Sequence, residues 1–314
     1  MSKELAIATY GLTKRFEGHI AVNDLDLQIK NGEVYGLIGP NGAGKTTLIK
    51  MLAMAEEPTK GEIYLNGDRL VRDDSNLLKK RIGYLPDDFP LYDDLTVWDY
   101  LDYYARLYGL KPSQRHRRLF EVLELVQLEN KRKSIISTLS RGMKQRLGLA
   151  RTIVHEPILL LLDEPVSGLD PLARQQFRQI IKILQEAGMT ILISSHVLSD
   201  LAELCTSIGI MELGFLVESA SLPELYQRLS RQQIILATLG KMEVLQQLLS
   251  QNSLVKTWEV IANNRLKVDF AGGEADCVEL LRSLVLADIP VTQFHCSSED
   301  LETIFLNLGH QQTS

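Results

Sequence analysis

The sequence predicts an α/β protein with a mostly parallel sheet covered by helices, followed by a small α+β domain. Three observations support this fold class. A glycine-rich loop at residues 39–46 follows an apolar run and precedes a helical pattern. Apolar strands and helical segments alternate from residue 158 onwards, which is typical of parallel sheets. After Pro223 a similar pattern restarts over shorter segments, which indicates a second domain.

The N-terminal residues 4–38 are rich in predicted strands, including the alternating segment Leu25-Asp26-Leu27-Gln28-Ile29. We expect an antiparallel β subdomain here. Asn31-Gly32 is a typical hairpin turn, so we expect the strands on either side of it to pair. Residues 61–65 and 82–85 predict two further strands.

The middle of the first domain changes to helical periodicity. Apolar residues recur at helical spacing between residues 96 and 108, and a second helical pattern follows Pro112. We expect a helical subdomain inserted at about residues 96–155. Strands at 158–162, 190–194 and 208–212 and helices at 172–186 and 197–205 then complete a first domain over residues 4–220.

The remaining residues, 222–314, predict a separate accessory domain with antiparallel pairing. Its candidate strands are 233–239, 265–270 and 291–296. Its candidate helices are 242–250, 275–286 and 301–308.

The glycine-rich loop has the spacing G-x-x-x-x-G-K-[ST] of a phosphate-binding loop, between a strand and a helix. Its glycines let the backbone wrap a polyphosphate, and the helix N-terminus presents partial positive charge to the anion. We expect Lys45 to reach the β- and γ-phosphates of a nucleoside triphosphate and the Thr46 hydroxyl to bind Mg²⁺. The alternative is a glycine-rich turn with a chance lysine.

Composition limits the environment and the partners of the chain. With 34 basic and 40 acidic residues, the net charge of −6 argues against a nucleic-acid partner. No run approaches the about 18 apolar residues of a transmembrane helix, and the N-terminus lacks the apolar core of a signal peptide. Cys205, Cys277 and Cys296 are sparse and far apart, which fits a reducing cytosol, and we expect all three to be buried.

A second acidic motif follows the apolar strand 158–162. Asp163 would place a carboxylate at the mouth of the sheet to hold Mg²⁺, and Glu164 could polarise an attacking water as a general base. The alternative is a strand that simply ends in an acidic turn. Upstream, Ser140 is well placed as a helix N-cap and Gly142 permits close backbone approach, although this could be an ordinary helix start.

The order of these motifs resembles the nucleotide-binding domain of ATP-binding cassette (ABC) transporters. The phosphate loop is followed by Leu-Ser-Arg-Gly-Met at 139–143, Leu-Leu-Leu-Leu-Asp-Glu-Pro at 159–165, Ser-Gly-Leu-Asp at 167–170 and Ile-Ser-Ser-His at 193–196. The resemblance covers about residues 4–220, and several ordered motifs are far more specific than any one of them.

The resemblance implies a role for each matching residue, with ATP and Mg²⁺ as the ligands. Glu164 would be the catalytic base and His196 the switch histidine. Thr46 and Asp163 would hold Mg²⁺, with Asp87 as a further candidate. The ATP contacts within the chain would be Phe16, Gly39, Pro40, Asn41, Gly42, Ala43, Gly44, Lys45, Thr46 and Thr47. The contacts to ATP bound by a second copy would be Ser140, Arg141, Gly142 and Asp170.

Three positions, in two motifs, depart from the pattern that this family usually shows. Asp87 stands where Gln is usual, and an ionised carboxylate cannot donate a hydrogen bond. Arg141 and Met143 stand where Gly and Gln are commonest, so Arg141 adds positive charge beside the expected γ-phosphate site.

The resemblance also implies partners. The sequence has one phosphate loop and one signature motif, the segment 139–143. The resemblance implies that a second copy or a close paralogue is required, with two-fold symmetry favoured. Transport would need separate integral membrane permease subunits, gripped by the region 96–128, and the chain would lie peripherally on the cytoplasmic face of the cell membrane. Residues 89–92 could offer apolar contact or simply pack in the core. The basic cluster at 115–118 and 131–133 could approach anionic lipid, but more often such a run is a solvated helix face.

We therefore expect an ATP-binding and ATP-hydrolysing subunit that powers export through a membrane-spanning partner. Export rests on residues 298–306, which resemble the close of C-terminal domains in drug- and polysaccharide-exporter ATPases, where that domain is regulatory or stabilises a dimer. The alternative is a soluble ABC ATPase that acts on a ribosome, DNA or another macromolecular complex. Such proteins usually carry two cassettes or long coiled coils, which this sequence lacks. A P-loop kinase or GTPase would leave the signature and the switch histidine unexplained.

Overall fold

The computed structural model describes residues 4–70, 78–229, 232–262 and 264–298. The chain divides into two compact units, Met1–Leu222 and Pro223–Ser314, and each is described here by itself. Within the described ranges, no helix is both long enough and apolar enough to cross a membrane.

The N-terminal part of the first unit is a four-stranded sheet in the order β2-β1-β4-β5. Its strands are β1 (Leu5–Phe16), β2 (His19–Lys30), β4 (Lys60–Leu65) and β5 (Asp68–Arg69). The pairs β1–β2, β1–β4 and β4–β5 are antiparallel, as the sequence predicted. Alternate residues of β2 are buried because one face of this sheet covers the core of the unit.

The hairpin predicted at Asn31-Gly32 is wrong. The strands on either side of this turn lie in different sheets, so they do not pair. The Gly32 N–H instead donates to Thr190 Oγ1 at 2.9 Å, on a strand of the second sheet. Gly32 has a φ of 74°, so the turn still needs a residue that tolerates a left-handed backbone.

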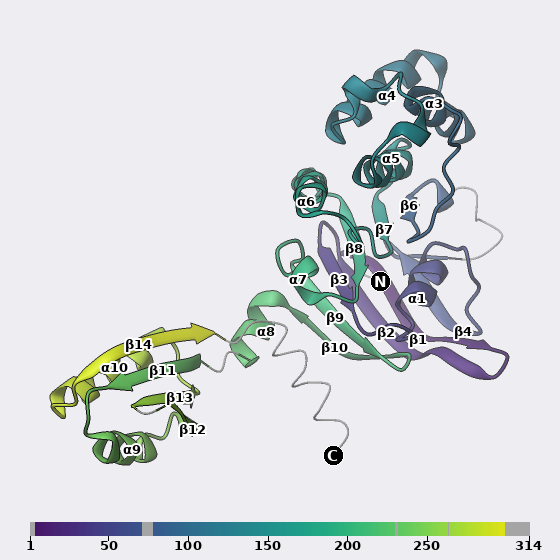
Figure 1. The fold of residues 1–314 in the computed structure, drawn as a ribbon. Helices are drawn as coiled ribbons and strands as arrows, with labels where there is room; N and C mark the ends of the chain where they lie inside the picture. The colour runs from purple at the N-terminus through teal and green to yellow at the C-terminus, as the bar shows by residue number, and fades with distance from the viewer. Residues whose placement is uncertain (1–3, 71–77, 230–231, 263, 299–314) are drawn as a thin grey trace. The chain divides into compact units, whose positions relative to one another are not determined.

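The second sheet has six strands in the order β10-β9-β3-β8-β7-β6 (Figure 1). They are β3 (Val34–Ile38), β6 (Ile82–Leu85), β7 (Leu159–Leu162), β8 (Thr190–Ser195), β9 (Ser207–Glu212) and β10 (Phe215–Ser221). All neighbouring pairs are parallel except β9–β10. The sequence did not predict β10, whose residues are mostly half-buried or exposed and so lack a continuous apolar run.

Helices connect and cover this second sheet. They are α1 (Lys45–Leu52), α6 (Pro171–Glu186) and α7 (Leu198–Ala202). The helical subdomain comprises α3 (Val97–Leu107), α4 (Pro112–Leu125), η2 (Glu129–Lys131), η3 (Ile136–Thr138) and α5 (Arg141–Ile153) (Figure 1). Thr96 caps α3 by accepting a hydrogen bond from Asp99 N at 3.1 Å, and Pro112 occupies the first turn of α4, where no backbone donor is needed.

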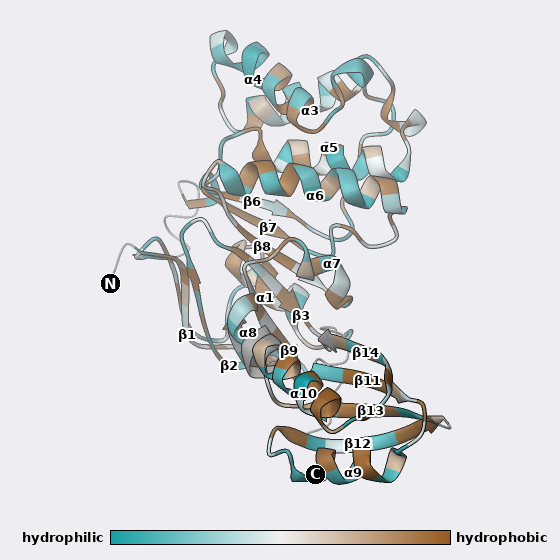
Figure 2. Ribbon diagram, turned by 90° about the vertical axis from the view of Figure 1, so that its left-hand side faces the viewer, coloured by the Kyte–Doolittle hydropathy of each residue, from teal (hydrophilic) through white to brown (hydrophobic). Residues whose placement is uncertain are grey.

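One apolar cluster joins the two sheets of the first unit to α1. It includes Leu27 from β2, Leu37 from β3, Leu48 from α1, Leu161 from β7 and Met211 from β9, all buried. The parallel strands β7 and β8 are brown along much of their length in Figure 2, because they are buried on both faces. This core holds the carboxyl ends of β3, β7 and β8 in a fixed arrangement, which matters for the site described below.

After α8 (Leu222–Leu229), the second unit runs in the order β-α-β-β-α-β. Its elements are β11 (Gln232–Thr238), α9 (Met242–Gln251), β12 (Val255–Ala262), β13 (Arg265–Phe270), α10 (Glu274–Leu286) and β14 (Val291–Ser298). The sheet order β12-β13-β11-β14 is antiparallel throughout and gives a ferredoxin-like topology.

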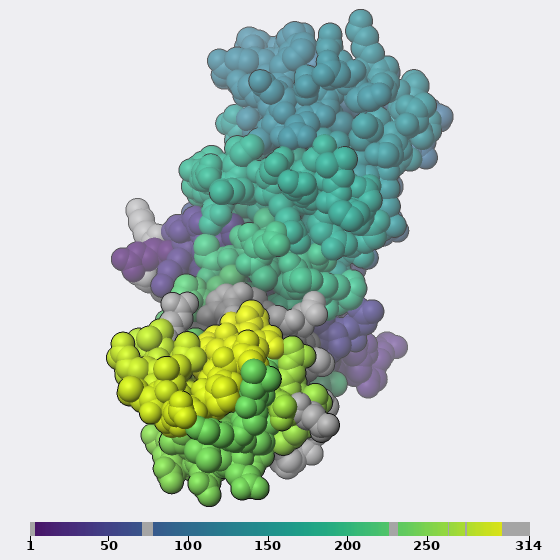
Figure 3. Space-filling model, turned by 60° about the vertical axis from the view of Figure 1, so that its left-hand side comes forward, coloured from purple at the N-terminus to yellow at the C-terminus, as the bar shows by residue number. Residues whose placement is uncertain are grey.

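Buried side chains from β11, β13, α9 and α10 form the separate core of this unit, and α10 packs beside β14. Figure 3 shows the surface of this unit, coloured from green to yellow along the chain. The sequence did not predict β12, because most of its residues are exposed and its apolar pattern is therefore weak. The helix predicted at 301–308 lies outside the described residues. Cys205 and Cys277 are buried, but the expectation for Cys296 is wrong, since it is exposed near the end of β14.

Candidate nucleotide-binding site

The phosphate loop connects the carboxyl end of β3, at the centre of the six-stranded sheet, to the start of α1. Gly44 precedes α1 with a φ of 103°, and a Cβ placed there would lie 2.2 Å from Ala21 O. A Cβ on Gly39 would lie 2.2 Å from Met211 O. Because no side chain fits at either position, the glycines let the loop turn tightly against two neighbouring strands.

A cavity of about 410 Å³ opens above this loop. It collects residues from segments that are far apart in the sequence. The lining residues are His19, Ala21, Asn41, Gly42, Ala43, Gly44, Lys45, Thr46, Thr47, Asp87, Glu164, Ser167 and His196. Sequence reasoning predicted ten of these thirteen residues and missed His19, Ala21 and Ser167.

The ammonium group of Lys45 is fixed at the mouth of the loop. Its Nζ donates to Gly39 O at 2.7 Å and to Pro40 O at 3.2 Å, and it lies 3.6 Å from Glu164 Oε1. Only 6% of the residue is exposed. A lysine held this way can meet an anion in the cavity at little cost in side-chain entropy.

Glu164 lies between Lys45 and His196. Its backbone follows β7 in the left-handed region, with a φ of 49°, which is uncommon for a residue with a side chain. Its Oε2 is 2.8 Å from His196 Nδ1, so the Glu164 carboxylate contacts a lysine through one oxygen and a histidine through the other. Strained backbone of this kind is often found at functional sites.

Asp163 is buried beneath the cavity and is oriented by a serine on the neighbouring strand. Its Oδ1 accepts a hydrogen bond from Ser194 Oγ at 2.7 Å, and Ser194 Oγ also accepts from Glu164 N at 3.0 Å. Within the described chain, Asp163 Oδ2 is buried and has no hydrogen-bond partner. Sequence reasoning missed Ser194, although the carboxyl ends of parallel strands β7 and β8 had to lie side by side.

The oxygens at this edge of the sheet fit a magnesium ion. Asp163 Oδ2 is an unpaired buried carboxylate oxygen, and the Thr46 side chain belongs to the cavity wall. The described residues contain no group of three or more His, Cys, Asp or Glu side chains that could hold a metal. This sparse donor set suits Mg²⁺, which commonly takes one or two protein oxygens together with water and substrate phosphate oxygens.

Asp87, the residue that stands where the family usually has Gln, lines the same cavity. Partial burial raises the pKa of its carboxyl, and the nearby charges of Asp163 and Glu164 raise it further, whereas Arg141 lowers it. The side chain is therefore more readily protonated than an ordinary aspartate, and the protonated form can donate a hydrogen bond.

Phe16 lies beside the cavity without lining it. Its ring stacks on that of His19, with 5.6 Å between the ring centroids, and Lys14 Nζ lies 4.9 Å from the Phe16 centroid. His19 lines the cavity, and 37% of Phe16 is exposed. A planar base could therefore stack here.

The residues expected to serve a second copy do not line the cavity of their own chain. Ser140 caps α5, with its Oγ accepting from Met143 N at 3.3 Å, and Asp170 caps α6, with its Oδ1 accepting from Ala173 N at 2.9 Å. Gly142 is needed because a Cβ there would lie 2.6 Å from Ala173 Cβ. Both helix starts therefore lie close together, outside the cavity.

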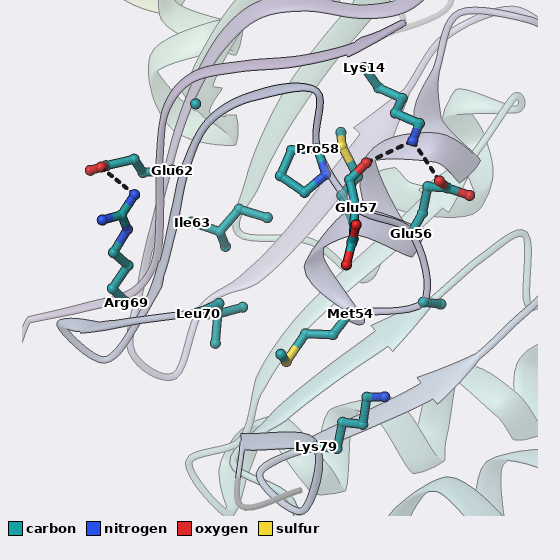
Figure 4. Close-up of a pocket in the computed structure, with 13 residues that line it drawn as sticks. Lys14, Met54, Glu56, Glu57, Pro58, Glu62, Ile63, Arg69, Leu70 and Lys79 are labelled. Atoms are coloured by element: carbon teal, nitrogen blue, oxygen red, sulfur yellow. Dashed lines mark hydrogen bonds and ion pairs between the residues drawn. The ribbon is translucent and has the colours of Figure 1, made fainter. Parts of the chain in front are cut away.

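A larger cavity, of about 470 Å³, lies at the end of α1 away from the phosphate loop (Figure 4). Lys14 pairs with Glu56 and Arg69 pairs with Glu62 at its walls. It contains none of the glycine-loop residues, so it is a poor match for a polyphosphate.

The basic cluster of the helical subdomain is largely paired internally. Arg115 Nε lies 2.5 Å from Asp102 Oδ1, and Arg117 and Arg118 both pair with Glu121. Arg118 also donates to Ile153 O and Val154 O at the end of α5. These contacts favour a solvated helix face over a lipid-binding surface.

Comparisons with known proteins agree with this geometry. A family model described as ABC transporter matches residues 22–167. An uncharacterized ABC transporter ATP-binding protein of Bacillus subtilis, YcbN, is 35% identical over 303 residues, which cover 96% of each chain. The bacitracin transport ATP-binding protein BcrA of Enterococcus faecalis is 34% identical over 98% of this chain and 97% of its own. A dimeric bacterial ABC transporter cassette, MJ0796, superposes with a TM-score of 0.63 at 26% identity, over 69% of this chain and 98% of that one.

Proposed function

Because this chain belongs to the ATP-binding cassette transporter family, we propose that it is the subunit that binds and hydrolyses ATP to power export through a separate membrane-spanning partner. The supporting observation is the convergence of Lys45, Glu164 and His196 above a glycine loop at the centre of a parallel sheet. A phosphate-binding lysine and a carboxylate base in one cavity are the two groups that phosphoryl transfer to water needs.

In this mechanism the chain positions the phosphates and handles the proton. Loop N–H groups and Lys45 bind the β- and γ-phosphates. Thr46 and Asp163 would hold Mg²⁺, which would neutralise charge on the phosphate oxygens. Glu164 orients the attacking water and accepts its proton at a carboxylate oxygen. His196, 2.8 Å from that carboxylate, holds it in place through Nδ1.

The rest of the site comes from a second cassette. Ser140, Arg141, Gly142 and Asp170 lie outside the cavity of their own chain, and a dimeric cassette is among the structures similar to this one. We propose that these residues contact ATP bound to the other copy, in a two-fold homodimer or a heterodimer with a paralogue. ATP then closes the dimer, and loss of the γ-phosphate opens it.

The membrane partner would dock on the helical subdomain, at the cytoplasmic face of the membrane. On α3, Tyr103 and Leu107 are 43% and 63% exposed. Tyr92, which precedes the subdomain, has its ring 5.9 Å from that of Tyr103 and is 45% exposed. Exposed aromatic and apolar side chains are frequent in protein interfaces. The name of the bacitracin transport relative supports a transport role, whereas the cargo would be selected by the membrane subunit.

The decisive experiment replaces the proposed base with its uncharged isostere. Glu164→Gln should retain ATP binding but lower the ATPase kcat by at least about 100-fold, because the amide cannot accept the water proton. It should also form an ATP-dependent dimer on size-exclusion chromatography. Glu186→Gln, the same change at an exposed residue at the end of α6 and outside the cavity, is the control and should hydrolyse ATP normally. A Glu164→Gln variant with wild-type turnover would remove ATP hydrolysis at this site from the function.

A further inference from the structure

We propose that Asp200, held between Arg174 and Arg178, is a positioning residue that ties His196 to the loop 167–170. His196, which serves the ATP bound by its own chain, would then move together with the loop 167–170 and the signature motif, which serve the ATP bound by the partner. This inference rests on the proposed function and adds residues to which no role has been given.

The cluster is built from two helices. Arg174 and Arg178 are four residues apart on α6, so they lie on one face of that helix. Asp200 lies on α7 with 5% of its side chain exposed. Its Oδ1 is 3.1 Å from Arg174 Nη1 and 3.8 Å from Arg178 Nη2. A buried carboxylate needs such positive partners, because burying an unpaired charge is very costly.

The cluster reaches the loop 167–170 through Arg174. Arg174 Nη2 donates to Leu169 O at 3.5 Å, next to Asp170, the N-cap of α6. The same first turn of α6 contacts the signature motif, because Gly142 packs on Ala173 and Arg141 Nη2 donates to Ser167 O at 3.0 Å. The proposed trans-acting residues therefore share one rigid support.

The cluster reaches His196 through the short segment that leads into α7. Asp200 is four residues after His196, and its N–H bonds to Val197 O at 3.3 Å. Arg178 Nη2 donates to Ser199 O at 3.3 Å and pairs with Glu203. These contacts fix both ends of α7 to α6, so a shift of α6 carries His196 with it.

The hydrogen bonding of the cluster also leaves room for a second arrangement of its side chains. Within the described residues, Asp200 Oδ1 and the Nε atoms of Arg174 and Arg178 are buried and make no aligned hydrogen bond, although the charges are adjacent. Buried polar atoms left without hydrogen bonds are costly, and a small rotation of either guanidinium would bring a donor onto Asp200. Closure of the dimer could supply that rotation.

The test uses the full-length chain and compares turnover with affinity. Asp200→Asn removes the charge and keeps the shape. We expect the ATPase kcat to fall by about tenfold while the KM for ATP stays within about twofold, because the ATP contacts themselves are unchanged. Asp200→Glu, which keeps the charge, should recover most of the kcat. Asp68→Asn is the matched control: it makes the same change at a carboxylate that is 65% exposed and paired with Arg81, outside the cluster, and it should leave kcat and KM unchanged.

A double variant tests whether Asp200 acts through His196. The residual rate of Glu164→Gln is subtracted as background from every rate. After this subtraction, adding Asp200→Asn to a His196→Ala chain should lower its kcat by less than about twofold, since the effects of residues that act as a unit are not additive. A further tenfold loss, or an unchanged kcat for Asp200→Asn alone, would overturn the proposal. If Asp200→Asn unfolds below the assay temperature, Arg174→Lys replaces it in the test. This variant keeps the positive charge but loses the guanidinium hydrogen bond to Leu169 O. A normal kcat for Arg174→Lys would overturn the proposal. A wild-type chain without ATPase activity would instead refute the proposed function.

Discussion

Ser194→Ala removes a hydroxyl that links the two acidic residues of the site. Ser194 Oγ donates to Asp163 Oδ1 at 2.7 Å and accepts from Glu164 N at 3.0 Å, and the residue is completely buried. Without it, Asp163 loses its hydrogen bond, and the Glu164 N–H loses its acceptor. The carboxylate of Asp163 would then be free to rotate away from the cavity.

The magnitude follows from these two bonds. A hydrogen bond to an ionised group contributes about 1.5–3 kcal/mol, and a buried N–H left unpaired costs about 1–3 kcal/mol. We therefore expect the free energy of unfolding of the first unit to fall by about 3 kcal/mol. Loss of the group that orients a metal ligand typically weakens metal affinity or activity by about 10–100-fold. The Mg²⁺ concentration for half-maximal ATPase activity should rise within that range.

Ser195→Ala provides a matched control on the same strand. Ser195 is also buried, but among the described residues its Oγ accepts only from Val197 N, at 3.0 Å, away from the carboxylates. It should cost about 1 kcal/mol of stability and leave the Mg²⁺ dependence unchanged. Urea unfolding and Mg²⁺ titrations of the ATPase rate measure both effects. Equal Mg²⁺ dependence in the two variants would refute the assignment of Ser194 as the residue that orients Asp163.

Two further predictions concern the loop and the helical subdomain. Gly44→Ala should abolish measurable ATP binding, because its Cβ would lie 2.2 Å from Ala21 O. Gly42 also has a positive φ, of 83°, but a Cβ there meets no atom of the described residues beyond its chain neighbours within 4 Å, so Gly42→Ala should lose less affinity. Equal losses by fluorescence titration would contradict this steric argument. Burial lowers the pKa of His155 to about 4 from 6.5, so its neutral form stabilises the fold above about pH 6.5, and up to about 3 kcal/mol is lost as pH falls towards 4. Urea unfolding against pH should show this slope, and a His155→Gln chain with the same slope would rule out His155 as its source.

Much of the site was predictable because its residues are adjacent in sequence or follow apolar strands. The phosphate loop carries its own spacing, and Asp163 and Glu164 follow a strand that is apolar throughout. Both signals are local. The order of the motifs then fixed the fold of the first unit, including the antiparallel sheet and the helical subdomain.

The rest depended on contacts between distant segments. Ser194 is one of two consecutive serines, and only the register of β8 against β7 decides which of them meets Asp163. His19 joins the cavity because β2 begins beside the phosphate loop, which no local pattern indicates. The prediction at Asn31-Gly32 was wrong because the residues of a turn determine only its backbone conformation. Which strands pair on either side of the turn depends on how their side chains pack in the core.

The two departures from the usual motif pattern act on each other within one chain. Arg141, which we propose contacts the ATP of a second copy, lies with its guanidinium against Gly168 of its own chain, where a Cβ would be 2.5 Å from Nη2, and it donates to Ser167 O. Its charge also lowers the pKa of Asp87, which burial and the acidic residues Asp163 and Glu164 raise. The negative charge of Asp87 in the cavity and the positive charge of Arg141 in the signature motif thus partly compensate each other. Removing the positive charge of Arg141 would therefore favour the protonated form of Asp87. The effects of substituting Arg141 and Asp87 should therefore not be additive, and the two residues should be replaced together.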